Sequence, residues 1–127
     1  MHKGFLRTAA LLGTLSVALG AFAAHSLRQY IAEHAVSIFE TAVRYQFYHV
    51  FALLACGILY KEFQNKLIST AGKLFISGII LFSGSLYTLA FIKGAVLAGY
   101  DWVGAITPVG GLCFIAGWLC MFAGMRR

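Results

Sequence analysis

The sequence predicts an all-α integral membrane protein, a four-helix antiparallel bundle with both termini in the cytoplasm. The first observation is that four long apolar stretches follow one another within 127 residues. The second is the composition, because 61% of the residues are hydrophobic, only 11% are charged, and the mean hydropathy is +0.83. A soluble domain of this size could not hide so much apolar surface from water. The third is the distribution of lysine and arginine, which orients the bundle.

The whole chain, residues 1–127, is predicted to be one transmembrane domain. A bilayer core about 30 Å thick requires roughly 20 apolar helical residues per crossing. The last two stretches have this length, and the first two reach it if Arg7 and Arg44 extend toward the headgroups. The first stretch also resembles a secretory signal peptide, but we interpret it as a span. The four predicted spans cover residues 5–24, 42–60, 74–92 and 104–125.

Residues 25–41 are the one long segment predicted to lie outside the membrane core. Apolar residues recur there at helical spacing with charged residues between them, which is typical of an amphipathic helix at the outer interface. No Gly or Pro occurs from Leu27 to Cys56, so the segment could also run directly into the second span. Glu40 and Arg44 are four residues apart, which predicts an ion pair on one helix face.

The orientation follows from the positive charges. Seven of the ten lysine and arginine residues lie before or at the start of the first span, between the second and third spans, or after the fourth. With four spans, all seven fall on one side of the membrane, which the positive-inside rule identifies as the cytoplasm. The net charge of +6 is therefore explained by the orientation of the chain and by contact with anionic headgroups, and no nucleic-acid partner is expected.

Small residues predict how the helices pack, since helices in lipid associate by close contact rather than by apolar burial. They recur at intervals of three, four or seven along the first, third and fourth spans. Pro108 is expected to kink the fourth span, or to be harmless if that helix begins near Thr107. A glycine face could alternatively bind a partner protein. The predicted packing glycines are Gly13, Gly20, Gly84, Gly110, Gly117 and Gly124.

Polar side chains from all four spans are predicted to gather in the outer half of the bundle. An ionisable residue at membrane depth is a functional candidate, because burying it without a partner is costly. His49 is expected near the midplane, where it could form a structural clasp, bind a small polar ligand or carry a proton. The candidate ligand-binding or polar-core residues are His25, Tyr45, Gln46, His49, Ser83, Tyr87, Thr88 and Thr107.

Several kinds of chemistry find no support in the sequence. His25 and His49 lie on different spans at different depths, so they are poorly placed to share a haem or metal, and no metal or cofactor is expected. With four acidic residues in total, neither paired carboxylates nor a catalytic triad can be assembled. The three cysteines fall within spans, where they are expected to act as small hydrophobic residues. We therefore expect no enzyme.

Four motifs resemble a known family. Residues 20–27 read GAFAAHSL, 39–49 read FETAVRYQFYH, 81–87 read LFSGSLY and 106–111 read ITPVGG. Together they are similar to the YgdD/YwdK-type small inner-membrane proteins, the domain of unknown function family number 423. Ala23 stands where that family's pattern has glycine, a small-for-small change. The resemblance covers essentially the whole chain and implies four spans in the bacterial plasma membrane, with no established reaction, cofactor or partner.

The sequence thus predicts a multi-pass membrane protein in which the polar residues of the spans gather in one cluster in the outer half of the bundle. The first expectation is that this cluster binds a small ligand or a lipid headgroup while it holds the bundle together. The alternative is an accessory subunit of a larger membrane complex, or a homo-oligomer, joined through a glycine seam. The third is a small transporter or proton-conducting element that uses His49.

Overall fold

The computed structural model describes residues 1–94 and 101–126. The described residues form four helices long and apolar enough to cross a membrane. In chain order, the elements are α1 (Lys3–His25), η1 (Leu27–Gln29), α2 (Glu33–Leu59), α3 (Lys66–Gly78), η2 (Ile79–Ser83), α4 (Gly84–Gly94), η3 (Asp101–Ala105) and α5 (Ile106–Gly124). The predicted all-α membrane fold is therefore confirmed.

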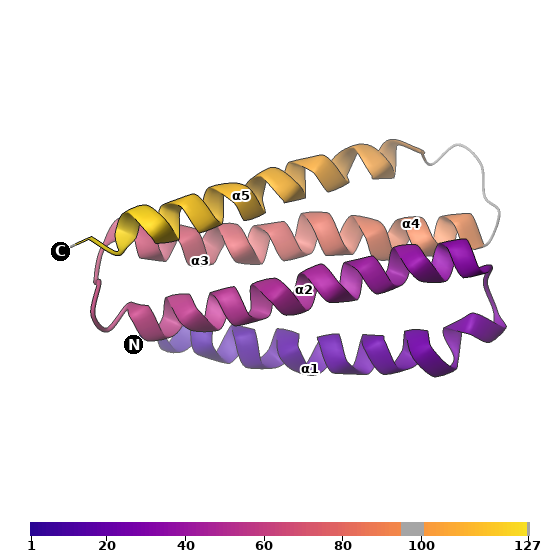
Figure 1. The fold of residues 1–127 in the computed structure, drawn as a ribbon, viewed down its shortest axis with the longest axis horizontal. Coiled ribbons are helices and arrows are strands. Elements are labelled where there is room, and N and C mark those ends of the chain that lie inside the picture. Colours follow the sequence, from indigo (N-terminus) through magenta and orange to yellow (C-terminus); the bar gives the residue numbers. More distant parts are fainter. Residues whose placement is uncertain (95–100, 127) are drawn as a thin grey trace.

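The helices form an antiparallel bundle in which each packs chiefly against its neighbours in the chain (Figure 1). α1 lies against α2, α2 lies against α3 and α4, and α3 lies against α5. Both chain ends lie at one end of the bundle, together with the link between α2 and α3 (Figure 1). We call this the terminal end, and the opposite end, where α1 leads through η1 into α2, the distal end.

The helix boundaries differ from the predicted spans in informative ways. Residues 33–41 form the first turns of α2, so the segment predicted to be interfacial is divided between the end of α1, η1 and α2. The third span begins at Lys66, where Asn65 caps the helix by accepting hydrogen bonds from two backbone N–H groups. Because α5 begins at Ile106, Pro108 lies in the first helical turn, where proline interrupts no intrahelical hydrogen bond.

One turn of π-helix, η2, interrupts the third span between α3 and α4. A π-helical turn carries one residue more than an α-helical turn, so it rotates the side chains that follow it relative to those before. The backbone of η2 lies very close to α5, since a Cβ atom on Gly110 would lie 2.7 Å from the Cα of Phe82. Glycine is therefore required at this contact.

Most of the predicted packing glycines lie at helix contacts, although not all do. Gly110, Gly117 and Gly124 face the third span so closely that an added Cβ would overlap Phe82, Phe75 and Ile68 respectively. Gly13 and Gly20 face α2 at ordinary contact distance. Gly84 has no atom within 4 Å of an added Cβ, so it does not mark a helix contact. Three tight positions went unpredicted: Gly57, Gly72 and Gly78.

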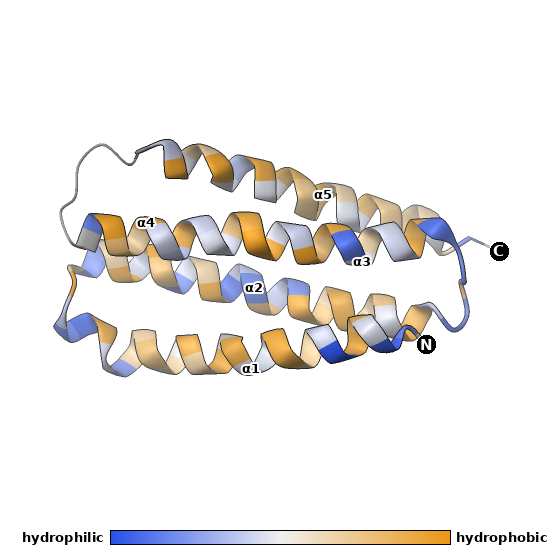
Figure 2. Ribbon diagram, turned by 180° about the vertical axis from the view of Figure 1, so that it is seen from behind, coloured by the Kyte–Doolittle hydropathy of each residue, from blue (hydrophilic) through white to orange (hydrophobic). Residues whose placement is uncertain are grey.

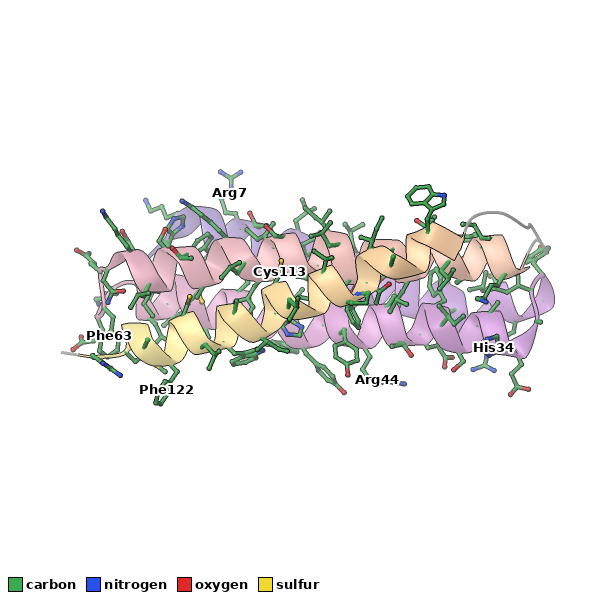
Figure 3. The ribbon with its side chains drawn as sticks, turned by 90° about the horizontal axis from the view of Figure 1, so that it is seen from above. Arg7, His34, Arg44, Phe63, Cys113 and Phe122 are labelled. Atoms are coloured by element: carbon green, nitrogen blue, oxygen red, sulfur yellow. The ribbon has the colours of Figure 1, made fainter. Side chains whose placement is uncertain are left out.

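The interior contains two apolar clusters, one toward each end. The larger includes Leu53, Phe75 and Phe114, and the smaller surrounds Phe39 near the distal end. Large apolar side chains also cover the outside, including Leu112 and Phe122, which points away from the bundle in Figure 3. An apolar exterior is the expected arrangement when lipid tails, rather than water, surround the helices.

Candidate functional site

The first polar link in the interior joins three helices through Gln46. Its side-chain amide donates to the backbone carbonyl of Leu12 on α1 at 3.1 Å. The Tyr87 hydroxyl on α4 donates to the Gln46 Oε1 at 2.6 Å. Ser16 donates to the same Leu12 carbonyl at 2.8 Å. This chain of bonds therefore ties α1, α2 and α4 together by one buried amide.

The second link places His49 between α2 and α5. The ring Nδ1 lies 2.7 Å from the Tyr45 carbonyl oxygen, and the indole N–H of Trp118 donates to Nε2 at 3.1 Å. A carbonyl only accepts and an indole N–H only donates, so the partners assign the proton to Nδ1 and leave the ring neutral. Phe114 stacks on the same ring, with centroids 3.5 Å apart.

The third link consists of hydroxyl groups at and beside the π-helical turn. Ser83 is buried and donates to the Ala42 carbonyl of α2 at 2.8 Å. Two residues later, the Ser85 and Thr107 hydroxyls lie 2.6 Å apart and join α4 to α5. Each of these bonds gives a polar group the hydrogen-bond partner that lipid tails cannot provide.

The remaining predicted site residues lie outside these links. His25 is exposed at the end of α1. Thr88 is exposed and donates to the Gly84 carbonyl of its own helix at 2.9 Å. Tyr45 contributes its backbone carbonyl to His49, while its ring packs on Phe82 with centroids 4.7 Å apart. The predicted residues thus form three separate links, with His25 and Thr88 outside them, rather than a single ligand-binding group.

Sequence reasoning missed partners that complete these links. Trp118 was not among the predicted site residues, although an indole N–H inside a bundle usually has an acceptor. Ser85 and Ser16 were not selected, and the Leu12 carbonyl carries no side-chain signal at all. Among described residues that are not exposed, every buried side-chain nitrogen and oxygen atom has a hydrogen-bond partner.

The predicted ion pair takes a different form in the structure. Glu40 binds Arg28, whose guanidinium nitrogen lies 2.7 Å from its carboxylate oxygen. The expected partner, Arg44, lies one turn further along α2. Arg28 reaches Glu40 because η1 turns the chain back beside the start of α2, a tertiary contact that helical spacing does not reveal.

Cavities open on the surface of the part of the chain that the structure describes. The first, of about 450 Å³, lies at the terminal end beside the first turns of α3. The second, of about 420 Å³, is an apolar groove between α1 and α2. The third, of about 230 Å³, lies between α4 and the start of α5 and is bordered by Thr88. None of the three is lined by Gln46, His49 or Tyr87.

The described residues include no group of three or more histidine, cysteine or acidic side chains that could hold a metal ion. The three cysteines are free, and the Cys56 thiol points to the Met121 sulfur at 3.6 Å in the apolar interior. Their surroundings are those of small hydrophobic residues.

Comparison with known proteins places the chain among uncharacterised membrane proteins. Residues 19–111 match a family model described as "Protein of unknown function (DUF423)". A UPF0382 membrane protein of Staphylococcus haemolyticus is 41% identical over 94% of this chain and 92% of its own length. One from Haemophilus influenzae is 40% identical over 98% and 94%, and YwdK of Bacillus subtilis is 38% identical over 92% and 91%. No solved structure matches.

Proposed function

The chain belongs to the DUF423 family of proteins of unknown function, and we propose that it is a non-enzymatic lipid-binding protein. In this proposal, it resides in the bacterial plasma membrane with its terminal end in the cytoplasm. Its interior polar residues act as a clasp that fixes the helices, and the binding surface lies elsewhere. The positive charge of the terminal end supports the orientation.

The observation that carries this proposal is that the interior polar groups bind one another. Gln46 uses both ends of its amide within the protein, and both nitrogens of His49 have partners. A ligand at either residue would first have to break these bonds without replacing them. The cavity at the terminal end differs, because polar side chains line it and face outward.

The same bonds give less support to proton conduction through His49. Proton transfer needs a ring nitrogen that can exchange its partner, but Phe114 covers one face of the ring and Trp118 holds Nε2. Toward the terminal end, His49 is followed in α2 by buried apolar residues, namely Val50, Ala52, Leu53 and Cys56.

The proposal is tested by native mass spectrometry of the protein extracted gently from its own membranes. We expect the protein to retain phospholipid in a reproducible ratio after a detergent exchange that strips lipid from its surroundings. His49→Gln should retain the same lipid, because the clasp lies away from the cavity. A protein that carries no lipid under conditions that preserve its fold would contradict the proposal.

A second candidate function is that of an accessory subunit, and the groove between α1 and α2 favours it. α1 packs chiefly against α2, and the groove beside this contact is lined by small residues of α1, including Ala10, Gly13 and Thr14, and by aromatic residues of α2. Small residues let another transmembrane helix approach closely, which is how helices associate in lipid. The occupant in this candidate is one helix of a partner protein.

Ala10→Trp should separate this partner from the chain, because the indole would fill the groove. Ala10 is exposed, so the bundle itself should keep its stability. Leu11→Trp is the matched control, since Leu11 is 63% exposed but does not line the groove. Co-purification followed by mass spectrometry measures the effect. Retention of a partner by both variants, or its loss from both, would contradict this candidate.

A further inference from the structure

The geometry points to a binding site for the phosphate group of an anionic phospholipid headgroup, in the cavity at the terminal end. This inference rests on the proposed function and names the class of lipid. The cavity has a volume of about 450 Å³, enough for a phosphate and part of its headgroup. Its lining carries cationic, hydroxyl and amide side chains, including Tyr60, Gln64, Lys66, Ser69, Thr70 and Lys73.

The first turns of α3 present these groups on one helix face. Lys66, Ser69, Thr70 and Lys73 are spaced at intervals of three, four and seven, so they share a face. The opposite face is buried against the bundle through Ile68, Ala71, Gly72 and Phe75. Between the two lysines, the helix rises about 10 Å at 1.5 Å per residue. Flexible ammonium side chains can therefore reach one phosphate from both ends, with two hydroxyls between them.

Asn65, which also lines the cavity, holds the start of α3 in place. Its Oδ1 accepts from the backbone N–H groups of Leu67 and Ile68, at 3.0 and 3.1 Å. Its Nδ2 donates to the Gly124 carbonyl at the end of α5, at 2.8 Å. Asn65 thus uses its side chain to fix the start of α3 against α5, so the site exists before a ligand arrives.

The remaining donors are not used inside the protein. Within the part of the chain that the structure describes, the side chains of Lys66, Ser69, Thr70 and Lys73 make no hydrogen bond or ion pair. By contrast, Thr14 and Thr41 donate to carbonyls of their own helices. A phosphate would supply acceptors to all four groups at once, and charge-assisted bonds to it are stronger than neutral ones.

The surroundings favour a lipid rather than a free phosphate as the source. Among the described residues, six lysine and arginine residues lie at this end, together with one acidic residue, Glu62. An anionic leaflet is attracted to such a surface. Lys73 lies two turns inside a span, at the depth where lysine side chains reach headgroups. Figure 2 shows hydrophilic positions, in blue, among the hydrophobic positions of α3.

The test uses the full-length protein in detergent, with lipid added in known amounts and adducts counted by native mass spectrometry. The probes are phosphatidylglycerol, phosphatidylcholine and inorganic phosphate. We expect the wild-type protein to retain phosphatidylglycerol in preference to phosphatidylcholine. Lys66→Ala with Lys73→Ala should weaken this retention about tenfold. Ser69→Ala with Thr70→Val should weaken it less, without a change of charge.

The matched control is Lys3→Ala with Arg7→Ala, which removes the same charge from the same end. Both residues are exposed on α1 outside the cavity, and Arg7 points away from the bundle in Figure 3. This control should leave retention within about twofold. An equal loss in both double variants would overturn the site in favour of general surface charge, provided that their melting temperatures match that of the wild type.

Two further outcomes separate this inference from the proposed function. Equal retention of the two lipids would overturn the anionic site while leaving lipid binding intact. Retention of neither lipid would reject the proposed function itself. Displacement of phosphatidylglycerol by inorganic phosphate at millimolar concentration would show that a free phosphate, rather than a headgroup, is the ligand.

Discussion

Gly110→Ala should destabilise the bundle more than any other single methyl group added to a predicted packing glycine. The new Cβ would lie 2.7 Å from the Cα of Phe82, and backbone atoms cannot rotate away as a side chain can. Adding atoms to a well-packed interior typically costs about 1–3 kcal/mol, and this contact lies at the upper end. We therefore expect a loss of about 3 kcal/mol in the free energy of unfolding, measured by denaturant titration in detergent micelles.

Gly84→Ala is the matched control for this experiment. It introduces the same methyl group on the facing span, where an added Cβ has no atom within 4 Å. Alanine is the better helix former by roughly 1 kcal/mol, so stability should stay the same or rise. If both variants lost stability equally, the close approach of α5 to η2 would be wrong.

The different surroundings of Gly110 and Gly84 also indicate which parts of the fold can be predicted from the sequence. The spans and their antiparallel order follow from hydropathy and from positive charge, because these are properties of whole segments. The rotation of each helix about its own axis, which decides the face that meets another helix, depends instead on individual side-chain contacts. Gly84 was chosen from the same regular spacing as Gly117, yet only Gly117 meets another helix. Spacing finds a stripe of small residues but cannot decide whether lipid or protein covers it.

The candidate site was predicted only in part, since its polar residues could be identified but their partners could not. Gln46 and His49 were identified because polar residues inside a span must have partners. Their partners were harder to identify, since the Leu12 carbonyl belongs to the backbone and Trp118 lies 69 residues from His49. The π-helical turn at η2 was also missed, because the apolar run through residues 79–82 has no feature that distinguishes it from an α-helix.

These limits matter for the partner hypothesis that the glycines first suggested. Gly110, Gly117 and Gly124 already contact the third span, so a seam made by them is not open to another protein. Gly117→Leu would consequently disturb the bundle itself, and loss of a partner after this change would not identify an interface. The groove beside α1 is the surface on which that hypothesis can be tested.

His49→Ala should show whether the interior polar residues are a clasp. The change removes a buried ring that stacks on Phe114, and it leaves the Trp118 indole N–H without its acceptor. Replacing a buried aromatic ring by alanine costs about 3 kcal/mol or more, and we expect a loss of that size in the free energy of unfolding. Trp118→Phe, which removes the hydrogen bond but keeps an aromatic ring, should cost about 1 kcal/mol.

His34→Ala is the control, because it makes the same substitution on the same helix. The His34 side chain is exposed near the distal end in Figure 3, so its removal should change the unfolding free energy by less than about 0.5 kcal/mol. The same variants should be compared for phospholipid retention below their unfolding transitions. A clasp requires that His49→Ala lower stability and keep the lipid. If it instead kept its stability and lost the lipid, the binding site would lie at His49, and the cavity beside α3 would lose its assigned role.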